Sequence, residues 1–407
     1  KSPSKEEVVA VCGDTAKTSS VTKRRNLRIG GAERKSLRRF LCALILGALA
    51  IDPSVLGSSG LTGRQLGENP FAEDEVDRAL KKALSYLLRL QKPDGSFCEK
   101  RWSRPGVIER NSTAMTSLAA LAIASLGHLC GEDSPEGKAL ARAVDCVLDP
   151  RRADFSEGEL YFGKKDGSRM YGHGITTLML AELLGMGAEE EQDRKIRRSL
   201  LPAIQLILKS QAVQKLPRYE GGWRYYPKSP DSDLSVTVWQ VMALRSAKNA
   251  GIPVAAEAIK KAADYIRRSY GSSKWEGGAL PFAYQPGGRP TYSTAAAGLL
   301  ALEVCGFYKD PKVRGAGDWL LRQRPRWGTS WLFYGTYYYA QGMYQLGGKY
   351  ADHAERVVKD LLLPRQNADG SWRASWGQER SAGTVYATSL AVLSLSVKYH
   401  YLPIYQR

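Results

Sequence analysis

Two copies of one short motif decide the fold, Gln91-Lys-Pro-Asp-Gly-Ser-Phe97 and Gln366-Asn-Ala-Asp-Gly-Ser-Trp372. The Asp-Gly pair supplies the positive φ that a tight turn needs, and the aromatic ring that follows can cover the end of a neighbouring helix. Looser copies end at Trp223 and Trp331, and a degenerate copy spans residues 274–280. Recurrence of one turn along the chain predicts an architecture of internal repeats.

Each turn lies between two kinds of helix. The first kind is amphipathic, and the stretch after Asp77 shows it with an apolar stripe that includes Leu80, Leu84 and Leu87. The second kind, as in residues 113–126 and 386–395, is apolar nearly all round and therefore belongs inside a shell of the first kind. The pattern predicts an all-α protein, an α/α toroid of six inner and six outer helices. Outer helices are expected to begin near Asp77, Ala139, Lys195, Ala256, Pro311 and Ala351, and inner helices near Asn111, Gly172, Ser232, Thr291, Ser330 and Ala382.

The turn motif, repeated around helix pairs, resembles the repeats of squalene–hopene cyclases and of protein prenyltransferase β-subunits. The resemblance covers about residues 75–400. It implies an α/α toroid whose turns are structural clasps, with an apolar lumen that could accept an isoprenoid or another lipid. This chain holds one toroid, whereas the cyclases have two.

The N-terminal part has a composition of its own. The chain carries 59 Lys and Arg against 41 Asp and Glu, a net charge of +18, and eleven of those basic residues precede Phe40. The apolar run Phe40–Ile51 follows, so the region has the two parts of a secretory signal. A helix of that run would be about 18 Å long, shorter than the bilayer core, so we expect no permanent membrane span.

This pattern predicts the domain organisation. Residues 1–60 are expected to be a basic segment with a signal peptide and a short linker, and residues 70–407 to form the toroid. The protein is then exported to the periplasm or cell envelope. A buried N-terminal helix with a basic tail is the alternative interpretation.

Composition also limits the partners. After Pro53 the net charge of +12 is spread thinly, and no nucleic-acid motif occurs, so we expect no nucleic-acid partner and at most attraction to an anionic membrane surface. Prenyltransferases hold zinc with Asp, Cys and His, but the chain has only four His residues and no inner-helix start that pairs Asp with Cys. An Asp-Asp-x-x-Asp magnesium motif is missing as well. We therefore expect no metal and no cofactor.

A candidate acid lies at the start of the third inner helix. The cyclases protonate an alkene with an Asp-x-Asp-Asp motif, and because an alkene is a very weak base the acid must be buried and kept protonated. The nearest match is Asp231-Ser-Asp233-Leu234, which has Leu where the last Asp should stand. The resemblance implies Asp233 or Asp231 as general acid, assisted by His173 at the start of the second inner helix. Helix capping is the alternative role for all three.

Aromatic residues gather near the inner-helix starts. The chain has 21 Tyr and 9 Trp but only 8 Phe. Rings there could line an apolar pocket or stabilise a cation, although packing between helices is the competing explanation for each of them. The candidate substrate-binding residues are Trp223, Tyr225, Trp239, Tyr292, Trp331 and Tyr334.

Three functions remain open from the sequence. The first is an isoprenoid- or lipid-binding toroid with terpene cyclase-type catalysis left undecided. The second is a non-catalytic binding or interaction protein of the cell envelope. The third is a carbohydrate-active α/α barrel that uses paired carboxylates such as Asp233 and Glu220.

Overall fold

The computed structural model describes residues 73–98, 109–271, 281–323 and 325–406. The predicted signal segment and the degenerate turn at 274–280 lie outside these ranges. The helical domain occupies Phe71–Arg407. Among its described helices, none is long and apolar enough to cross a membrane.

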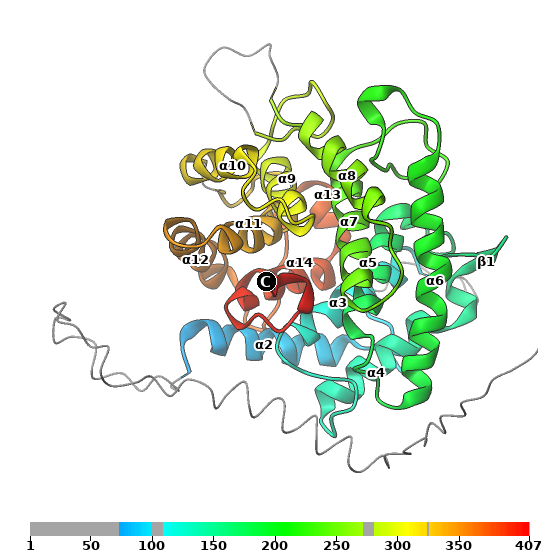
Figure 1. Cartoon of the computed structure of the whole chain (residues 1–407). Coiled ribbons are helices and arrows are strands. Elements are labelled where there is room, and N and C mark those ends of the chain that lie inside the picture. Colours follow the sequence, from blue (N-terminus) through cyan, green and yellow to red (C-terminus); the bar gives the residue numbers. More distant parts are fainter. Residues whose placement is uncertain (1–72, 99–108, 272–280, 324, 407) are drawn as a thin grey trace, which may run out of the picture. The chain divides into compact units, whose positions relative to one another are not determined.

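Twelve of the helices that the structure describes form two concentric layers (Figure 1). The inner helices are nearly uniform in burial, and the outer helices bury one face. The inner layer consists of α3 (Ser112–Ala124), α5 (Arg169–Leu183), α7 (Leu234–Asn249), α9 (Tyr292–Val304), α11 (Leu332–Leu346) and α14 (Thr384–Leu395). The outer layer consists of α2 (Glu75–Leu90), α4 (Pro135–Leu148), α6 (Glu190–Ala212), α8 (Ala256–Arg268), α10 (Pro311–Arg322) and α12 (Lys349–Leu362).

The inner helices form a closed ring. Each packs against the next in sequence, and α14 packs against α3. They run in the same direction, because residues near their C-terminal ends pair: Glu182 of α5 with Ser246 of α7, and Gln341 of α11 with the Leu393 carbonyl of α14. The predicted α/α toroid is confirmed, and every helix begins within a few residues of its expected start.

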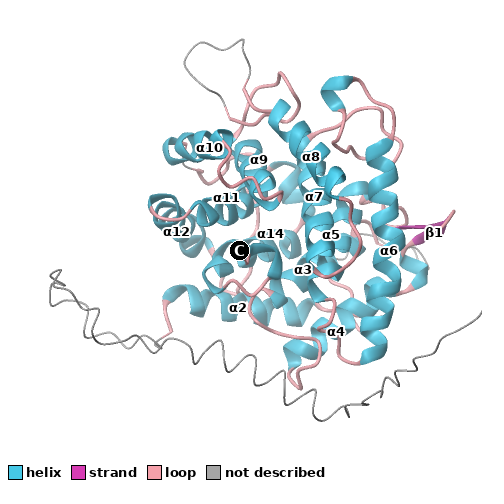
Figure 2. Ribbon diagram, in the orientation of Figure 1, coloured by secondary structure: helices cyan, strands magenta, loops and turns pink. Residues whose placement is uncertain are grey.

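Two short strands and one short helix lie in the connections between the main helices (Figure 2). The short strands β1 (Asp154–Ser156) and β2 (Glu159–Tyr161) form an antiparallel hairpin before α5, and the short helix α13 (Gly377–Ala382) precedes α14. The sequence pattern predicted neither of them.

The glutamine of the turn motif fastens neighbouring outer helices. Gln91 Nε2, after α2, donates to the Ala139 carbonyl of α4 at 2.7 Å, and Gln366 Nε2, after α12, donates to the Ala79 carbonyl of α2 at 2.8 Å. The second bond joins the last outer helix to the first and so closes the ring. Gln211 repeats the arrangement between α6 and α8.

The glycine of the motif lets the turn approach the next helix closely. Gly95 has φ +82°, and a Cβ there would lie 2.2 Å from the Arg142 carbonyl oxygen of α4. Gly370 has φ +93°, and its Cβ would lie 2.3 Å from the Lys82 carbonyl oxygen of α2. Only glycine satisfies both the positive φ and the contact.

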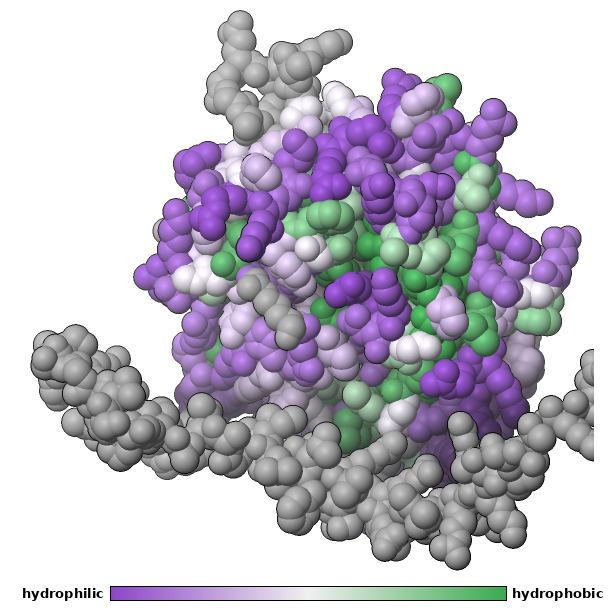
Figure 3. Space-filling view, viewed as in Figure 1, coloured by the Kyte–Doolittle hydropathy of each residue, from purple (hydrophilic) through white to green (hydrophobic). Residues whose placement is uncertain are grey.

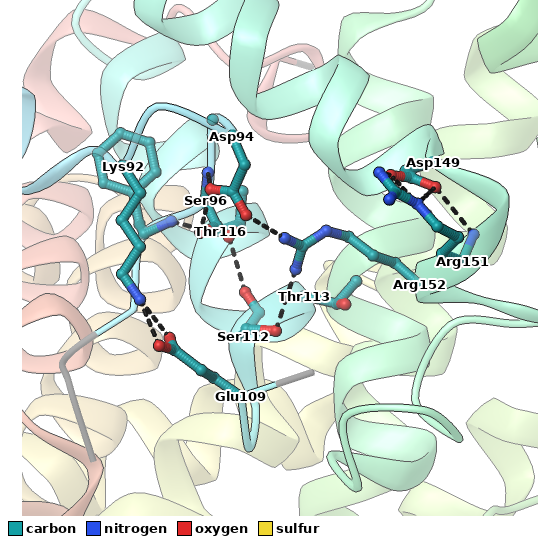
Figure 4. A network of polar contacts seen from close by, with 12 residues as sticks. Lys92, Asp94, Ser96, Glu109, Ser112, Thr113, Thr116, Asp149, Arg151 and Arg152 are labelled. Carbon is teal, nitrogen blue, oxygen red and sulfur yellow. Dashed lines mark hydrogen bonds and ion pairs between the residues drawn. The ribbon is translucent and has the colours of Figure 1, made fainter. Parts of the chain in front are cut away.

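The aromatic residue of the motif links the outer helix to the inner one. The Trp372 ring is fully buried, its Nε1 donates to the Leu362 carbonyl at 2.8 Å, and its backbone N–H donates to Thr388 Oγ1 of α14 at 3.0 Å. Phe97 donates in the same way to Thr116 of α3. Figure 4 shows the polar contacts around that first turn, where Asp94 accepts from Ser96 and from Arg152. We call each such set, glutamine, glycine, aromatic ring and threonine, a clasp.

The C-terminal segment crosses the end of the ring formed by the C-terminal ends of the inner helices. In Figure 1 it is the red coil over the middle of the ring, and it contains the 3₁₀ turn η6 (Pro403–Tyr405). The Ile404 N–H donates to Glu182 Oε2 of α5 at 3.1 Å, and the Tyr405 hydroxyl bonds the Tyr337 hydroxyl of α11. Residues 402–405 therefore pack against the inner helices at this side of the ring.

Truncation of a clasp ring should destabilise the fold. We expect Trp372→Ala to lower the free energy of unfolding by about 3–5 kcal/mol, because it removes a fully buried indole. Denaturant unfolding measures the loss. Trp376→Ala is the matched control, since that ring is 55% exposed, and its loss should be much smaller. Equal midpoints for native protein and Trp372→Ala would contradict the structural role of the clasp.

Glu182 makes stability depend on pH. Burial raises the pKa of Glu182 from its ordinary 4.5 to about 7. Because the folded state holds this proton more tightly than the unfolded state, the associated stability is complete below pH 4.5 and is lost as the pH rises to about 7. Across that pH window the free energy of unfolding of the native protein should fall by up to about 3 kcal/mol relative to that of Glu182→Gln. Unfolding curves of both proteins at several pH values test this, and a constant difference between them would contradict it.

Candidate functional site

The ends of the inner helices opposite the C-terminal segment carry three buried carboxyl groups, one each at α3, α7 and α11. Asp166, Asp233 and Glu379 are all less than 5% exposed, and burial raises the pKa of each above its ordinary value. We call this end of the ring the mouth. Such carboxyls are stable there because free N–H groups at helix N-termini can solvate the charge.

Two of these carboxyls are used as helix caps across repeats. Asp166, in the loop before α5, accepts from the Thr113 and Ala114 N–H groups at the start of α3. Glu379 of α13 accepts from the Tyr334 N–H at the start of α11 at 2.9 Å. Neither α3 nor α11 has a side-chain cap of its own. These two acids are therefore committed to structure.

Asp233 is arranged differently. It caps its own helix, α7, with Oδ1, which accepts from the Val236 N–H at 2.9 Å and from the Ser235 hydroxyl at 2.6 Å. Its second oxygen, Oδ2, is buried and faces the Arg224 guanidinium, with Nε 3.4 Å away. The pKa of Asp233 is raised by burial, while Ser235, Val236 and Arg224 oppose that shift. The capping alternative thus accounts for one of the two oxygens.

Asp231 shares the same arginine. Its carboxylate is 36% exposed and lies 3.1 Å from Arg224 Nη1. The Arg224 guanidinium also lies over the rings of Tyr225 and Tyr284, at 4.8 and 5.6 Å from their centroids. The two acids of the Asp-x-Asp motif are therefore joined by one cation that is held between two aromatic rings. Nothing in the sequence pattern singled out Arg224.

His173 lies away from these acids, where a clasp has its threonine. Its Nδ1 accepts from the Phe162 N–H at 3.4 Å, and its Nε2–H donates to the Ala203 carbonyl of α6 at 3.1 Å. This is the place that Thr116 and Thr388 take in other repeats. Burial lowers the pKa of His173 to about 4, so the ring is neutral at physiological pH.

Trp223 also belongs to a clasp. It is fully buried, its Nε1 donates to the Ile207 carbonyl of α6 at 2.8 Å, and its backbone N–H donates to Thr237. Trp372 makes the equivalent contacts in the last repeat. The indole therefore sits between an outer and an inner helix.

Other predicted rings do converge at the mouth. Tyr334 is half-buried, and its hydroxyl donates to the Ser235 carbonyl, two residues beyond Asp233, at 2.9 Å. Tyr225 is half-buried as well, and its hydroxyl bonds that of Tyr284. Trp331 is 43% exposed, with its ring 6.3 Å from that of Tyr334. Of these rings, Tyr225 contacts Arg224 directly, and Tyr334 reaches the α7 start through Ser235.

Below the mouth the rings meet across the interior. Trp239 of α7 stacks on Tyr337 of α11, with centroids 5.7 Å apart, and lies 5.8 Å from Tyr338. Helices α7 and α11 are separated in the ring by α9, so this contact spans the interior. Tyr292 of α9 lies 5.5 Å from Tyr339. The aromatic cluster therefore extends from Asp233 towards the opposite end.

Several members of the site were missed from sequence. Tyr171 bonds the Ser235 hydroxyl from α5, and Tyr284 comes from the loop before α9. Both stand beside residues that the pattern did mark, but neither occurs in a motif. Within the described ranges, no group of three or more His, Cys, Asp or Glu side chains is arranged to hold a metal ion. The roles predicted for the nine site residues stay predictions.

Comparisons with known proteins relate the fold to two classes of enzyme. No family model matches the chain, and no curated protein sequence matches it. Among solved structures, the type II terpene cyclase MstE from Scytonema is similar, with a TM-score of 0.51, 16% identity, and coverage of 81% of this chain and 98% of that one. A variant of that cyclase in complex with its product, merosterolic acid A, gives a TM-score of 0.52 at 15% identity, with the same coverage.

A glycoside hydrolase is equally similar. The α-1,6-mannanase GH76A of Salegentibacter sp. HEL1_6 gives a TM-score of 0.52 at 9% identity, covering 81% of this chain and 100% of that one. At these identities the likeness concerns the fold. The domain of this chain is thus an α/α toroid of the kind found in both a terpene cyclase and a mannanase.

Proposed function

We propose that the protein binds an isoprenoid or a similar apolar lipid in its aromatic interior. The observation that carries this proposal is the convergence of rings from α5, α7, α9 and α11 on one end of the ring, next to a buried acid. Aromatic faces provide large apolar contact area and also tolerate a nearby positive charge. The similarity in fold to a cyclase that holds merosterolic acid A supports the proposal.

Proton-initiated cyclisation is the second candidate function. Burial raises the pKa of Asp233, which is the direction that a proton donor to an alkene requires. Arg224 works in the opposite direction, because a cation 3.4 Å from Oδ2 favours the carboxylate. The last position of the acid motif is Leu234, so no acid stands directly after Asp233. For these reasons we place lipid binding before catalysis.

The carbohydrate-active alternative has weaker support in the site. A glycosidase needs two carboxyl groups across an open groove. Asp233 is fully buried, and its proposed partner Glu220 is exposed. Asp231 and Asp233 share one cation, Arg224, so neither carboxyl faces an open groove as a free pair would. The similarity in fold to the mannanase keeps this alternative open, together with a non-catalytic role in the cell envelope.

Binding can be measured with geranylgeraniol as the probe. We expect geranylgeraniol to displace the fluorophore N-phenyl-1-naphthylamine from the full chain. The Tyr338→Leu substitution should weaken the affinity for geranylgeraniol by about tenfold, because it removes ring contact. Tyr308→Leu is the control, because Tyr308 is exposed and lies outside the aromatic cluster. Equal affinity for both variants would contradict binding in the interior.

Incubation of the protein with geranylgeraniol also tests whether Asp233 acts as a proton donor. The products are analysed by gas chromatography and mass spectrometry. We expect no cyclic product from the native chain. Product that persists in Asp231→Asn and vanishes in Asp233→Asn would instead establish catalysis. Asn is as good an N-cap as Asp, so Asp233→Asn should keep the α7 start intact, and Asp231→Asn removes the other partner of Arg224.

Export is proposed on the basic and apolar pattern of residues 1–60. On that basis, secretion in a bacterial host should yield a mature chain that begins after Ile51, because the h-region lies upstream of the cleavage site. Intact-mass measurement of the purified protein decides this. A mature chain that retains residues 24–51 would contradict the signal-peptide interpretation and favour the buried-helix alternative.

A further inference from the structure

Two tryptophan rings are exposed at the rim of the mouth, beside the start of α11. Trp331 is 43% exposed and Trp376 is 55% exposed, whereas the other tryptophans of the described ranges are buried or half-buried. Figure 3 shows the opposite end of the ring, where hydrophilic residues lie around the rim and apolar ones nearer the middle. An exposed indole forgoes the free energy of burial, so two of them at one place point to a contact outside the chain.

Trp331 has a backbone conformation that a tryptophan adopts only at a cost in free energy. It is the N-cap of α11, with φ +56° and ψ +44°, in the left-handed region. The N-cap of α3, Asn111, has the same conformation with φ +59°, and asparagine tolerates it better than most residues. The start of an inner helix therefore explains the left-handed backbone at Trp331 but not the choice of a bulky ring, whose strain is not offset by burial.

Two hydrogen bonds fix the segments that carry these rings relative to each other. Trp376 Nε1 donates to the carbonyl of Gly328, three residues before Trp331. Glu379, three residues after Trp376, accepts at 2.9 Å from the N–H of Tyr334, three residues after Trp331. The two segments are thus tied on both sides of the tryptophans. Because the rings already stand on fixed backbone, a ligand that contacts both has little ordering cost to offset.

The side chains exposed around the two rings are polar. Apart from the tryptophans and Gly377, the exposed residues of 325–331 and 373–380 all carry hydrogen-bond donors: Arg326, Ser330, Arg373, Ser375, Gln378 and Arg380. Neither segment adds an exposed aliphatic side chain, so the rings do not form the continuous apolar face that docks on a lipid bilayer. A sugar has the complementary chemistry, because its ring has an apolar C–H face that packs on an indole and hydroxyls at its edge that need hydrogen-bond partners.

We propose that Trp331 and Trp376 form a saccharide-binding site at the rim of the mouth. The indole faces take the apolar faces of pyranose rings, and the hydroxyl, amide and guanidinium groups around them bond the sugar hydroxyls. The site lies on the surface, so it does not depend on lipid binding in the interior. Its ligand is either a free saccharide or the sugar head group of a lipid, and the chemistry at the two rings is the same for both.

The experiment is calorimetric titration of the full chain with maltotetraose, cellotetraose and α-1,6-mannotetraose. We expect at least one of them to bind, and Trp331→Asn and Trp376→Ala each to weaken its affinity by about tenfold or more, because each removes one stacked face. Trp331→Asn keeps the left-handed start of α11, since Asn111 has that conformation in α3, so the variant should fold. Tyr401→Ala is the matched control, because it removes a ring that is 53% exposed at the opposite end.

Maltose and dodecyl maltoside, the second used below its micelle concentration, distinguish the two sources of the sugar. Equal affinity for both indicates a free saccharide, and tighter binding of the maltoside indicates a lipid head group.

Three results would overturn the saccharide site. They are no binding of any tetrasaccharide, affinity that both tryptophan variants retain, and binding to phosphatidylglycerol vesicles through the same two rings in place of any sugar. None of them bears on isoprenoid binding in the interior, which the displacement assay with Tyr338→Leu tests separately.

Discussion

The structure depends on one recurring hydrogen bond, from a glutamine amide to a backbone carbonyl of the next outer helix. Gln91, Gln211 and Gln366 make it between α2 and α4, α6 and α8, and α12 and α2. A ring of helices has no free end at which a misfit can relax, so each neighbour must be held at a set distance. The clasp does this by fixing three things at once: the adjacent outer helix through the glutamine, the close approach of the turn through the glycine, and the inner helix through the aromatic N–H and a threonine.

Because the inner helices are parallel, positive partial charge collects at the mouth. Their N-terminal ends meet there, and each brings unpaired N–H groups and the positive end of its dipole. Buried carboxyls satisfy that need at α3, through Asp166 of a neighbouring loop, and at α11, through Glu379 of α13. Asp233 meets the same need at α7 with a single oxygen and leaves the other facing Arg224. The candidate acid is therefore a variation on a structural device. Its distinguishing feature is the second oxygen, which faces Arg224 instead of a helix N-terminus, and not the burial that it shares with the other two.

The interior of the ring combines small residues with large aromatic rings. Small residues on the inner helices allow close packing, and large rings from α7 and α11 reach across the space that remains. Two of the tyrosines have paired hydroxyls, Tyr334 with the Ser235 carbonyl and Tyr337 with Tyr405. The buried rings of Trp239, Tyr337 and Tyr338 pack on one another and make this interior apolar. At one end of this interior Ile404 and Tyr405 are buried against the inner helices.

The sequence by itself determined the fold, because the clasp is local. Its glutamine, glycine and aromatic ring lie within a few residues, and the alternation of amphipathic and uniformly apolar helices follows from residue periodicity. Only the tertiary structure decided the site. Asp233 and Asp231 were visible as a motif, but the arginine between them, the tyrosines from α5 and from the loop before α9, and the return of the C-terminus to the ring all depend on contacts distant in sequence. His173 and Trp223 were predicted as site residues, but both are bonded to backbone carbonyls of α6 and lie between an outer and an inner helix. No side-chain pattern in the sequence encodes those bonds.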